Sequence, residues 1–247
     1  LTRLIHLATF AFSSLPALIA QIHWKPDVIL CIAPALMNAP FVLAFAQMLG
    51  SRSWLHIQDF ELDTALNLGI LSGKNFISSW ARSFERFVIT RFDRVSTISK
   101  NMLALAVQKA GGADGMLLFP NWVDTRRIFP LVDEVNSLRT TLGLSTEQLV
   151  ILYAGTMGRK QGLEQLLATA RQLQDQPQLQ FVLCGEGVIR AELEISAQGL
   201  PNVHFLPVQP IEKLNQLLNM ADIHVLLQKA DAADLVMPSK LSGMFAS

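Results

Sequence analysis

LVILYAGTMGRKQGLEQLLATARQL, residues 149–173, is the stretch of this chain that decides its fold. It opens with an apolar, β-branched run at 149–154, which is typical of a buried strand. Gly155 and Gly158 follow, two cations come directly after them, and leucines recur at helical spacing beyond Gly162. Glycines allow close approach of the backbone, and the free N–H groups and dipole of a helix N-terminus favour an anion. The stretch predicts a strand–turn–helix unit suited to a diphosphate, although an ordinary strand-to-helix turn has the same spacing.

The composition excludes several classes of function. The chain has 247 residues, of which 51% are hydrophobic and 16% charged, and its formal net charge is zero. A neutral chain has no compositional support for a basic face, so no nucleic-acid partner is expected. Cys31 and Cys184 lie inside apolar runs and are expected to be buried thiols in a reducing compartment. The five histidines are scattered, and their spacing predicts no metal site.

Both ends of the chain favour a fragment of a longer protein. It begins at Leu1 without a methionine, already in a helical pattern, and stops at Ser247 in an opening helical pattern. Residues 4–22 are almost uncharged, but His6 and Pro16 interrupt them, and α/β patterning resumes directly afterwards. We therefore expect a buried helix or a helix on a membrane surface rather than a transmembrane span.

Strand and helix patterns alternate along the chain. In the first half, strands are predicted at 24–34, 53–59, 93–99 and 116–124, and helices at 38–49, 76–91 and 100–110. In the second half, strands are predicted at 149–154, 179–187, 202–208 and 222–228, with helices between them. This alternation is typical of doubly wound parallel sheets. A change to mixed charge divides the chain into an N-terminal domain (1–130), a linker (131–147) with a polar helix at 132–142, and a C-terminal domain (148–247).

Two carboxylates follow the predicted strand 53–59. Asp59 and Glu61 come after its carboxyl end, where ligands bind in open α/β sheets. They are candidate catalytic residues that hold a ligand hydroxyl or assist its deprotonation, and helix-capping or surface carboxylates would show the same pattern. His56 lies inside the strand and is expected to be a satisfied core or edge histidine rather than a base.

Four segments make the pattern specific. They are PNWVDTRRIFP (120–130), YAGTMGRKQGLEQLL (153–167), LCGEGVIRAEL (183–193) and VHFLPVQPIEKLNQLLNMADIHVLL (203–227). In this order they resemble the landmarks of the retaining glycosyltransferases of family 4 (group 1), with Trp122 in place of a glycine in the first segment. WLHIQDFELD (54–63) and LLQKADAADLVMPSK (226–240) most resemble the fucosyltransferases of colanic-acid biosynthesis.

The resemblance covers essentially the whole chain and carries expectations about fold and function. It implies an α/β protein of the GT-B fold, with two facing Rossmann-like domains, parallel sheets that are both incomplete here, and a ligand cleft between the domains. It implies transfer of a sugar from a nucleotide sugar, with GDP-fucose as the suggested donor, to a glycan or lipid-linked glycan in surface polysaccharide synthesis. No cofactor and no metal ion are expected. The resemblance suggests the cytoplasm, with peripheral contact to the inner face of a bacterial plasma membrane.

The glycine turn and the resemblance together predict the donor site. The predicted donor-binding residues are Gly155, Thr156, Met157, Gly158, Arg159, Lys160, Gly185, Glu186, Asp231, Ser239 and Lys240. The three cations among them, Arg159, Lys160 and Lys240, would stabilise the departing diphosphate together with the backbone N–H groups of 155–158. Glu186 would contact the nucleotide ribose or base, and Asp231 would position the sugar ring.

The sequence departs from the family pattern at three further positions. Many members carry Arg and Lys in the glycine loop where this chain has Thr156 and Gln161, and Gly243 stands at the family's second glutamate. We expect Arg159 and Lys160 to take over the charge of the loop, and Ser239 and Lys240 to supply the sugar or phosphate contacts. Two alternatives remain open: a nucleotide-sugar 2-epimerase of the same fold, and a catalytically silent sugar-nucleotide binding module.

Overall fold

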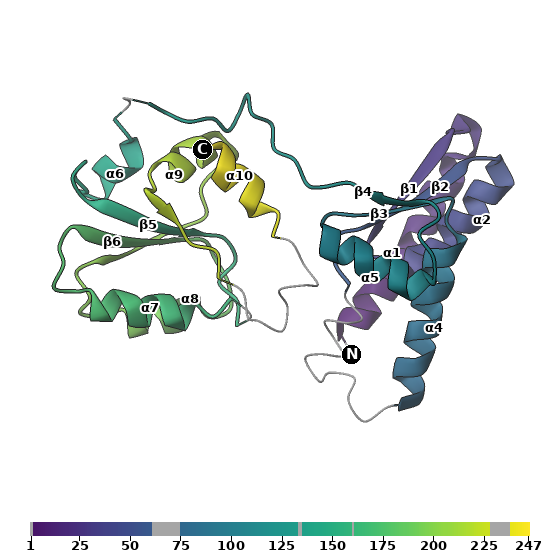
Figure 1. Cartoon of the computed structure of the whole chain (residues 1–247), viewed down its shortest axis with the longest axis horizontal. Helices are drawn as coiled ribbons and strands as arrows, with labels where there is room; N and C mark the ends of the chain where they lie inside the picture. The colour runs from purple at the N-terminus through teal and green to yellow at the C-terminus, as the bar shows by residue number, and fades with distance from the viewer. Residues whose placement is uncertain (1, 61–74, 133–134, 160, 228–237) are drawn as a thin grey trace. The chain divides into compact units, whose positions relative to one another are not determined.

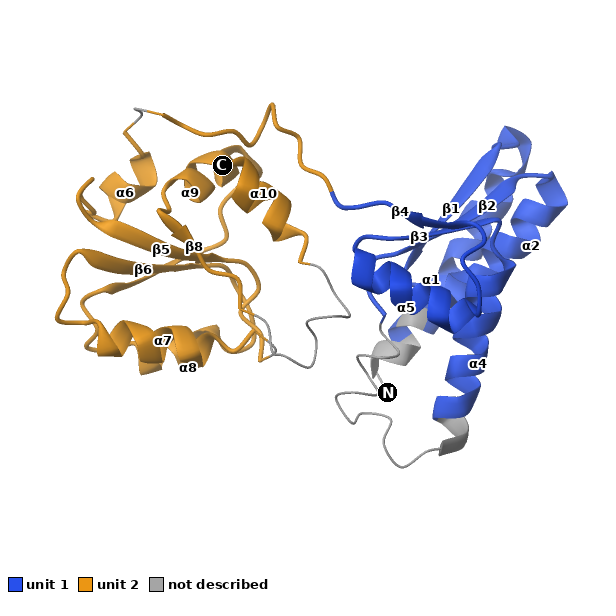
Figure 2. Cartoon of the chain, viewed as in Figure 1, with its two compact units in different colours: residues 1–121, 231–237 blue, residues 122–230, 238–247 orange. Residues whose placement is uncertain are grey.

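The computed structural model describes residues 2–60, 75–132, 135–159, 161–227 and 238–247. These residues form two compact units that divide between residues 121 and 122, and residues 238–247 belong to the second (Figures 1 and 2). Each unit contains one sheet of four parallel strands. The expected α/β class with two parallel sheets is confirmed.

Unit 1 alternates strands and helices from its first helix onward. Its described elements are α1 (Thr2–Ala20), η1 (Ile22–Trp24), β1 (Val28–Ala33), η2 (Leu36–Asn38), α2 (Ala39–Leu49), β2 (Arg52–Ile57), α4 (Asn75–Arg91), β3 (Arg94–Thr97), α5 (Lys100–Ala110) and β4 (Met116–Leu118). The sheet has the sequential order β1-β2-β3-β4, with Cys31 beside Leu55 and His56 beside Ser96.

Local sequence explains where the helices of unit 1 begin and end. α2 ends at Gly50 and α5 ends at Gly111, and both glycines adopt the left-handed conformation, with φ of 70° and 80°. α5 begins after Ser99, whose hydroxyl accepts the N–H of Met102 at 3.2 Å. A glycine after the last turn and a serine before the first are the usual terminal residues of helices.

The core of unit 1 lies on one face of its sheet. Cys31, Leu55 and Val95 of three strands pack with Val88 of α4 and Met102 of α5. On the opposite face, Leu30 and Ile32 of β1 are half exposed. The expected doubly wound arrangement is therefore not seen in the described part of unit 1. Sequential strand order with right-handed crossovers explains this, because it places all connecting helices on the same face.

Unit 2 contains the elements α6 (Ser137–Thr141), β5 (Leu149–Ala154), α7 (Leu163–Gln172), β6 (Leu179–Cys184), α8 (Arg190–Ser196), β7 (Val203–Leu206), η3 (Ile211–Lys213), α9 (Leu214–Asn219), β8 (Ile223–His224) and α10 (Lys240–Ala246). Its strand order is β7-β6-β5-β8, so the direction of winding reverses at β5. One core joins the sheet to α7 and α8, and another joins it to α6 and α9. Unit 2 is thus doubly wound.

Some predicted elements are shorter in the structure. The strand predicted at 116–124 ends at Leu118, because Pro120 cannot donate to a strand ladder. The strand predicted at 222–228 is the two-residue β8, although the N–H of Val225 still donates to the carbonyl of Leu152 at 2.8 Å. The polar helix predicted at 132–142 is the five-residue α6.

The first helix matches the expectation of a helix at 4–22. α1 has 19 residues, contains Pro16, and packs Phe12 against Phe41 of α2 with ring centroids 5.9 Å apart. Of the helices in the described ranges, none has the length and apolar character needed to cross a bilayer.

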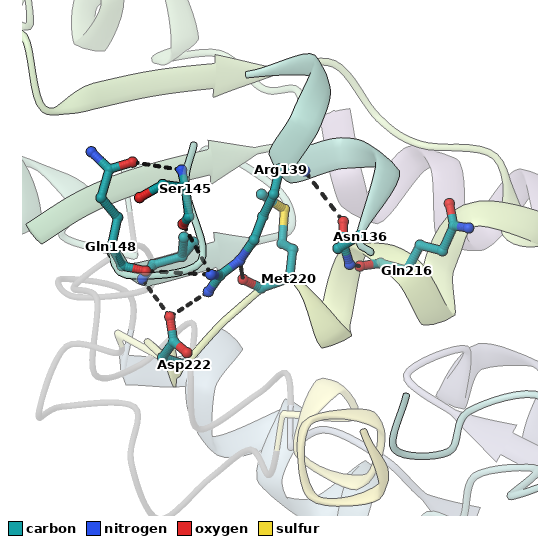
Figure 3. A network of polar contacts seen from close by, with 8 residues as sticks. Asn136, Arg139, Ser145, Gln148, Gln216, Met220 and Asp222 are labelled. Carbon is teal, nitrogen blue, oxygen red and sulfur yellow. Dashed lines mark hydrogen bonds and ion pairs between the residues drawn. The ribbon is translucent and has the colours of Figure 1, made fainter. Parts of the chain in front are cut away.

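The segment before β5 is joined to unit 2 by a buried guanidinium (Figure 3). The Nε of Arg139 donates to the carbonyl of Met220 at 2.8 Å, and its Nη1 donates to the carbonyl of Gln148 at 3.3 Å. The same guanidinium pairs with the carboxylate of Asp222, which also accepts the N–H of Val150 at 2.7 Å. Part of the predicted linker is thus packed within unit 2.

Candidate functional site

The reversal of strand order in unit 2 locates its candidate site. β5 lies between β6 and β8, and the connecting helices diverge to opposite faces of the sheet at this point. In open α/β sheets, ligands bind outside the carboxyl ends of the strands at such a switch point. Gly155 follows the last residue of β5, so the predicted glycine turn lies where this rule places a ligand.

The two glycine turns of unit 2 interlock without room for side chains. A Cβ atom at Gly185 would lie 1.9 Å from the carbonyl oxygen of Gly155, and one at Gly187 would lie 2.2 Å from that of Met157. The N–H of Met157 donates to the carbonyl of Glu186 at 2.8 Å. Glycine is therefore required at 185 and 187 for the contact between the turns.

The contact between the two turns leaves fewer backbone N–H groups available for an anion than the sequence predicted. The N–H of Gly155 donates to the carbonyl of Cys184 at 2.8 Å, and the N–H of Met157 is used by Glu186. The side chain of Met157 is fully buried in the core, so it cannot contact a ligand. Among the described residues, the N–H groups of Thr156 and Gly158 have no hydrogen-bond partner, and these two remain available for an anion.

The side chain of Lys240 lies directly against the first glycine turn. A Cβ atom at Gly155 would be 1.6 Å from the Nζ of Lys240, so the ammonium fills the space that the glycine leaves. The Nζ lies 5.0 Å from the ring centroid of Tyr153, over its face. Burial lowers the pKa of Lys240 below its usual value. Within the described part of the chain no carboxylate pairs with this ammonium. The structure thus brings together two of the predicted residues that are distant in sequence.

Tyr153 is a residue of this site that sequence reasoning missed. Its hydroxyl donates to the carbonyl of Thr156 at 2.6 Å, and burial raises its pKa to about 12. It is the only tyrosine of the chain, inside a run that otherwise consists of aliphatic residues. That isolated polar atom in a buried strand is a signal that could have identified it, because a buried hydroxyl requires a partner.

The other predicted cations and the serine of the donor site are placed differently. Arg159 pairs with Glu192 of α8 at 2.9 Å, and its side chain is 70% exposed. Ser239 is exposed and precedes α10. Lys160 and Asp231 lie outside the described residues, so their predicted roles stay predictions.

Glu186 is held by an arginine of the next helix. Arg190 donates to the carboxylate of Glu186 at 2.7 Å, to the carbonyl of Gly185 at 2.5 Å and to Glu194 at 2.8 Å. The carboxylate of Glu186 remains 59% exposed. A ligand could therefore still reach it, and its predicted contact with a nucleotide stays a prediction.

In unit 1 the structure describes one of the two predicted catalytic carboxylates. Asp59 is partly buried and follows β2 at the carboxyl edge of the sheet, and Glu61 lies outside the described residues. His56 is buried, with Nδ1 2.8 Å from the hydroxyl of Ser96 and Nε2 2.9 Å from the side-chain amide of Gln58. Burial lowers the pKa of His56. The expectation of a satisfied core histidine is confirmed.

The cysteines and histidines of the described residues form no metal centre. No group of three or more ligand-type side chains comes together in these parts of the chain. Cys31 and Cys184 are both buried and free, and burial raises the pKa of Cys31 to about 11. Thiols of this kind stay protonated and unreactive at neutral pH.

Comparison with known sequences identifies two domains. Residues 3–122 match the family described as glycosyl transferase 4-like domain, and residues 135–233 match glycosyl transferases group 1. A protein of Escherichia coli named as a colanic acid biosynthesis glycosyl transferase, WcaI, is 43% identical over all of this chain. WbjE of Pseudomonas aeruginosa, named as a probable glycosyltransferase, is 24% identical over 87% of the chain. The chain spans 61% and 54% of the lengths of these two relatives.

Solved structures share the fold. HepE of Anabaena, solved with UDP, has a TM-score of 0.65 and 19% identity over 87% of this chain and 57% of its own. Sucrose-phosphate synthase of Thermosynechococcus elongatus has a TM-score of 0.65 and 17% identity over 84% of this chain and 52% of its own. These similarities confirm a GT-B-like fold.

Proposed function

Because this chain carries the domains of the family 4, or group 1, glycosyltransferases, we propose that its protein transfers a sugar from a nucleoside-diphosphate sugar to a glycan acceptor. The observation that carries the proposal is the ammonium of Lys240 over Gly155, at the switch point of the sheet of unit 2. A cation that no described carboxylate pairs with, beside two backbone N–H groups without a partner among the described residues, is suited to a diphosphate.

In the proposed reaction, the bond between the sugar's anomeric carbon and the diphosphate oxygen breaks. The oxygen of an acceptor hydroxyl forms the new bond to that carbon, and the hydroxyl proton is released. The electron pair of the broken bond stays on the diphosphate, whose added negative charge needs stabilisation. Lys240 and the N–H groups of Thr156 and Gly158 would supply it without further charge from a metal ion.

We propose Asp59 as the residue of unit 1 that holds the acceptor hydroxyl and accepts its proton. Its place after β2 at the carboxyl edge of the sheet supports this role. Replacement Asp59→Asn should lower kcat with a smaller effect on the KM for the donor. An unchanged kcat for Asp59→Asn would remove it from the acceptor site.

The stereochemistry, the donor and the acceptor are proposed from the similarity to relatives. Retention of the anomeric configuration, GDP-fucose as donor and a lipid-linked oligosaccharide as acceptor follow from the resemblance to colanic-acid enzymes, and the similarity to a colanic acid biosynthesis glycosyl transferase supports that process. Binding of UDP by HepE makes uracil the competing base. Peripheral contact with the inner face of a membrane is part of the same proposal.

The donor can be tested by thermal unfolding of the protein with a panel of nucleotide sugars. GDP-fucose, GDP-mannose, UDP-glucose and UDP-galactose are compared with GDP and UDP, because a ligand that binds only the folded state raises the midpoint. A selective rise with one sugar nucleotide, followed by transfer of its sugar to a lipid-linked acceptor, would support the proposal. No rise with any of them would contradict it. Turnover of the sugar nucleotide without an acceptor would indicate a 2-epimerase instead.

A further inference from the structure

Tyr153 makes two separate contacts with the candidate anion site. It is the fifth of the six residues of β5, and its side chain is 1% exposed. Its hydroxyl contacts the turn that follows β5, and the face of its ring contacts the ammonium of Lys240. The two contacts use different parts of the side chain, so they can be removed one at a time.

The hydroxyl of Tyr153 fixes one peptide unit of the turn. This peptide joins Thr156 to Met157: its carbonyl accepts the tyrosine hydroxyl at 2.6 Å, and its N–H donates to Glu186 at 2.8 Å. With both polar groups held, the plane of the peptide cannot rotate. The N–H groups of Thr156 and Gly158, which remain available for an anion, belong to the peptides on either side of this one. The peptide that carries the Gly158 N–H is held in turn, because its carbonyl, on Met157, accepts the N–H of Ile189 at 3.2 Å.

The ring of Tyr153 accounts for the position of Lys240. An ammonium that is partly removed from water requires a compensating interaction. Among the described residues Lys240 has no ion pair, and the face of the Tyr153 ring, 5.0 Å from Nζ, carries the negative quadrupole that attracts a cation. The neighbouring Gly155 provides the space for this arrangement.

We propose that Tyr153 is the positioning residue of the anion site, its hydroxyl orienting the turn and its ring seating the Lys240 ammonium over Gly155. The inference rests on the proposed function for the identity of the anion, a nucleoside diphosphate. The placement of Lys240 rests on its contact with the ring of Tyr153 and does not depend on that identity.

Three variants separate the two contacts from general packing. Tyr153→Phe keeps the ring and removes the hydroxyl, and Tyr153→Leu removes both. Phe181→Leu is the matched control, because Phe181 lies on β6 in the same core and is also 1% exposed. The position of Lys240 is read from NMR of protein labelled on lysine side chains, with its signal assigned by its loss in Lys240→Ala. Protons over a ring face are shifted upfield.

We expect the upfield signal of Lys240 in the parent, in Tyr153→Phe and in Phe181→Leu, and its loss in Tyr153→Leu. The dissociation constant for GDP or UDP, whichever the parent binds more tightly, rises about threefold to tenfold in Tyr153→Phe, the loss expected for one hydrogen bond. It rises further in Tyr153→Leu and stays within about twofold in Phe181→Leu.

Two results would overturn the inference. One is an unchanged Lys240 signal in Tyr153→Leu, which would show that the ring does not seat the ammonium. The other is equal weakening of binding by Phe181→Leu and Tyr153→Phe, which would show that loss of the hydroxyl acts only through the general packing of the core. If no nucleoside diphosphate binds the parent, the proposed function fails, and the signal of Lys240 still decides whether the ring positions it.

Discussion

At residue 155 a glycine leaves the space that the ammonium of Lys240 fills. A methyl group there would lie 1.6 Å from Nζ, so Gly155→Ala should displace the lysine and weaken binding of a nucleoside diphosphate by tenfold or more, as expected for about 1.5 kcal/mol or more from one charge-assisted contact. Titration calorimetry measures the change.

Gly199→Ala is the control for backbone strain at Gly155. Gly199 has φ +81°, and a Cβ atom there would meet nothing within 4 Å. This variant should lose about 1 kcal/mol of stability and keep its diphosphate affinity. Equal affinities of the two alanine variants would contradict the steric role of Gly155.

Asp93 makes the stability of unit 1 depend on acid pH. Hydrogen bonds from the backbone and side chain of Ser53, and then from Arg52, lower its pKa from 3.8 to about 2. The folded state therefore favours the carboxylate, so the contribution of Asp93 is complete above about pH 4 and is lost as the pH falls toward 2. The denaturation midpoint should fall over this range in the parent and less in Asp93→Asn. Parallel pH profiles would contradict this linkage.

At the residue scale, the sequence predicted the glycine turn better than the contacts of the side chains around it. Gly155 and Gly158 are visible as a pattern, and so is the neighbouring Lys160. The ion pair of Arg159 with Glu192 depends on the packing of α8 beside the turn, which no local pattern contains. No local pattern contains the contact of Lys240 with Gly155 either, because the two residues lie 85 positions apart in sequence.

At the scale of elements, buried helices and strands were predicted well and edge elements less well. α2 and α5 end at the glycines that the pattern indicated. β5 has the predicted bounds, because strands that are buried on both faces are apolar throughout. β4 and β8 lie at sheet edges, where an apolar run can continue into a loop without pairing. Hydrophobicity alone does not show where such a strand ends.

The contacts that Arg139 makes between α6, the end of α9 and the start of β8 should contribute strongly to the stability of unit 2. Arg139 is 14% exposed and bonds the carbonyls of Met220 and Gln148 as well as the carboxylate of Asp222. Arg139→Ala leaves these acceptors without the guanidinium, and we expect a loss of about 2–4 kcal/mol in urea denaturation. Arg171→Ala is the matched control, because Arg171 is exposed and donates to the carbonyl of Ser196. It should cost less than about 1 kcal/mol. Equal losses of stability in the two variants would contradict this role of Arg139.

At the scale of the whole chain, alternation of strands and helices predicted two parallel α/β units, and the order of motifs predicted the family. Alternation does not contain the strand order, so the one-sided core of unit 1 could not be distinguished from the two-sided core of unit 2. The family match covers both units, at residues 3–122 and 135–233. The side chains proposed to bind donor and acceptor lie mainly in loops, which follow neither pattern.

The proposed function requires that a nucleoside diphosphate binds at the carboxyl end of β5 against Lys240. The most direct measurement is calorimetric titration of the parent, Lys240→Ala and Lys213→Ala with the preferred nucleoside diphosphate. Lys213→Ala is the control, because Lys213 is an exposed lysine of η3 in the same unit. We predict that Lys240→Ala weakens binding by about tenfold to a hundredfold, the loss of one charge-assisted contact, and that Lys213→Ala changes it less than about twofold. Equal affinities of the parent and Lys240→Ala would contradict the proposed function.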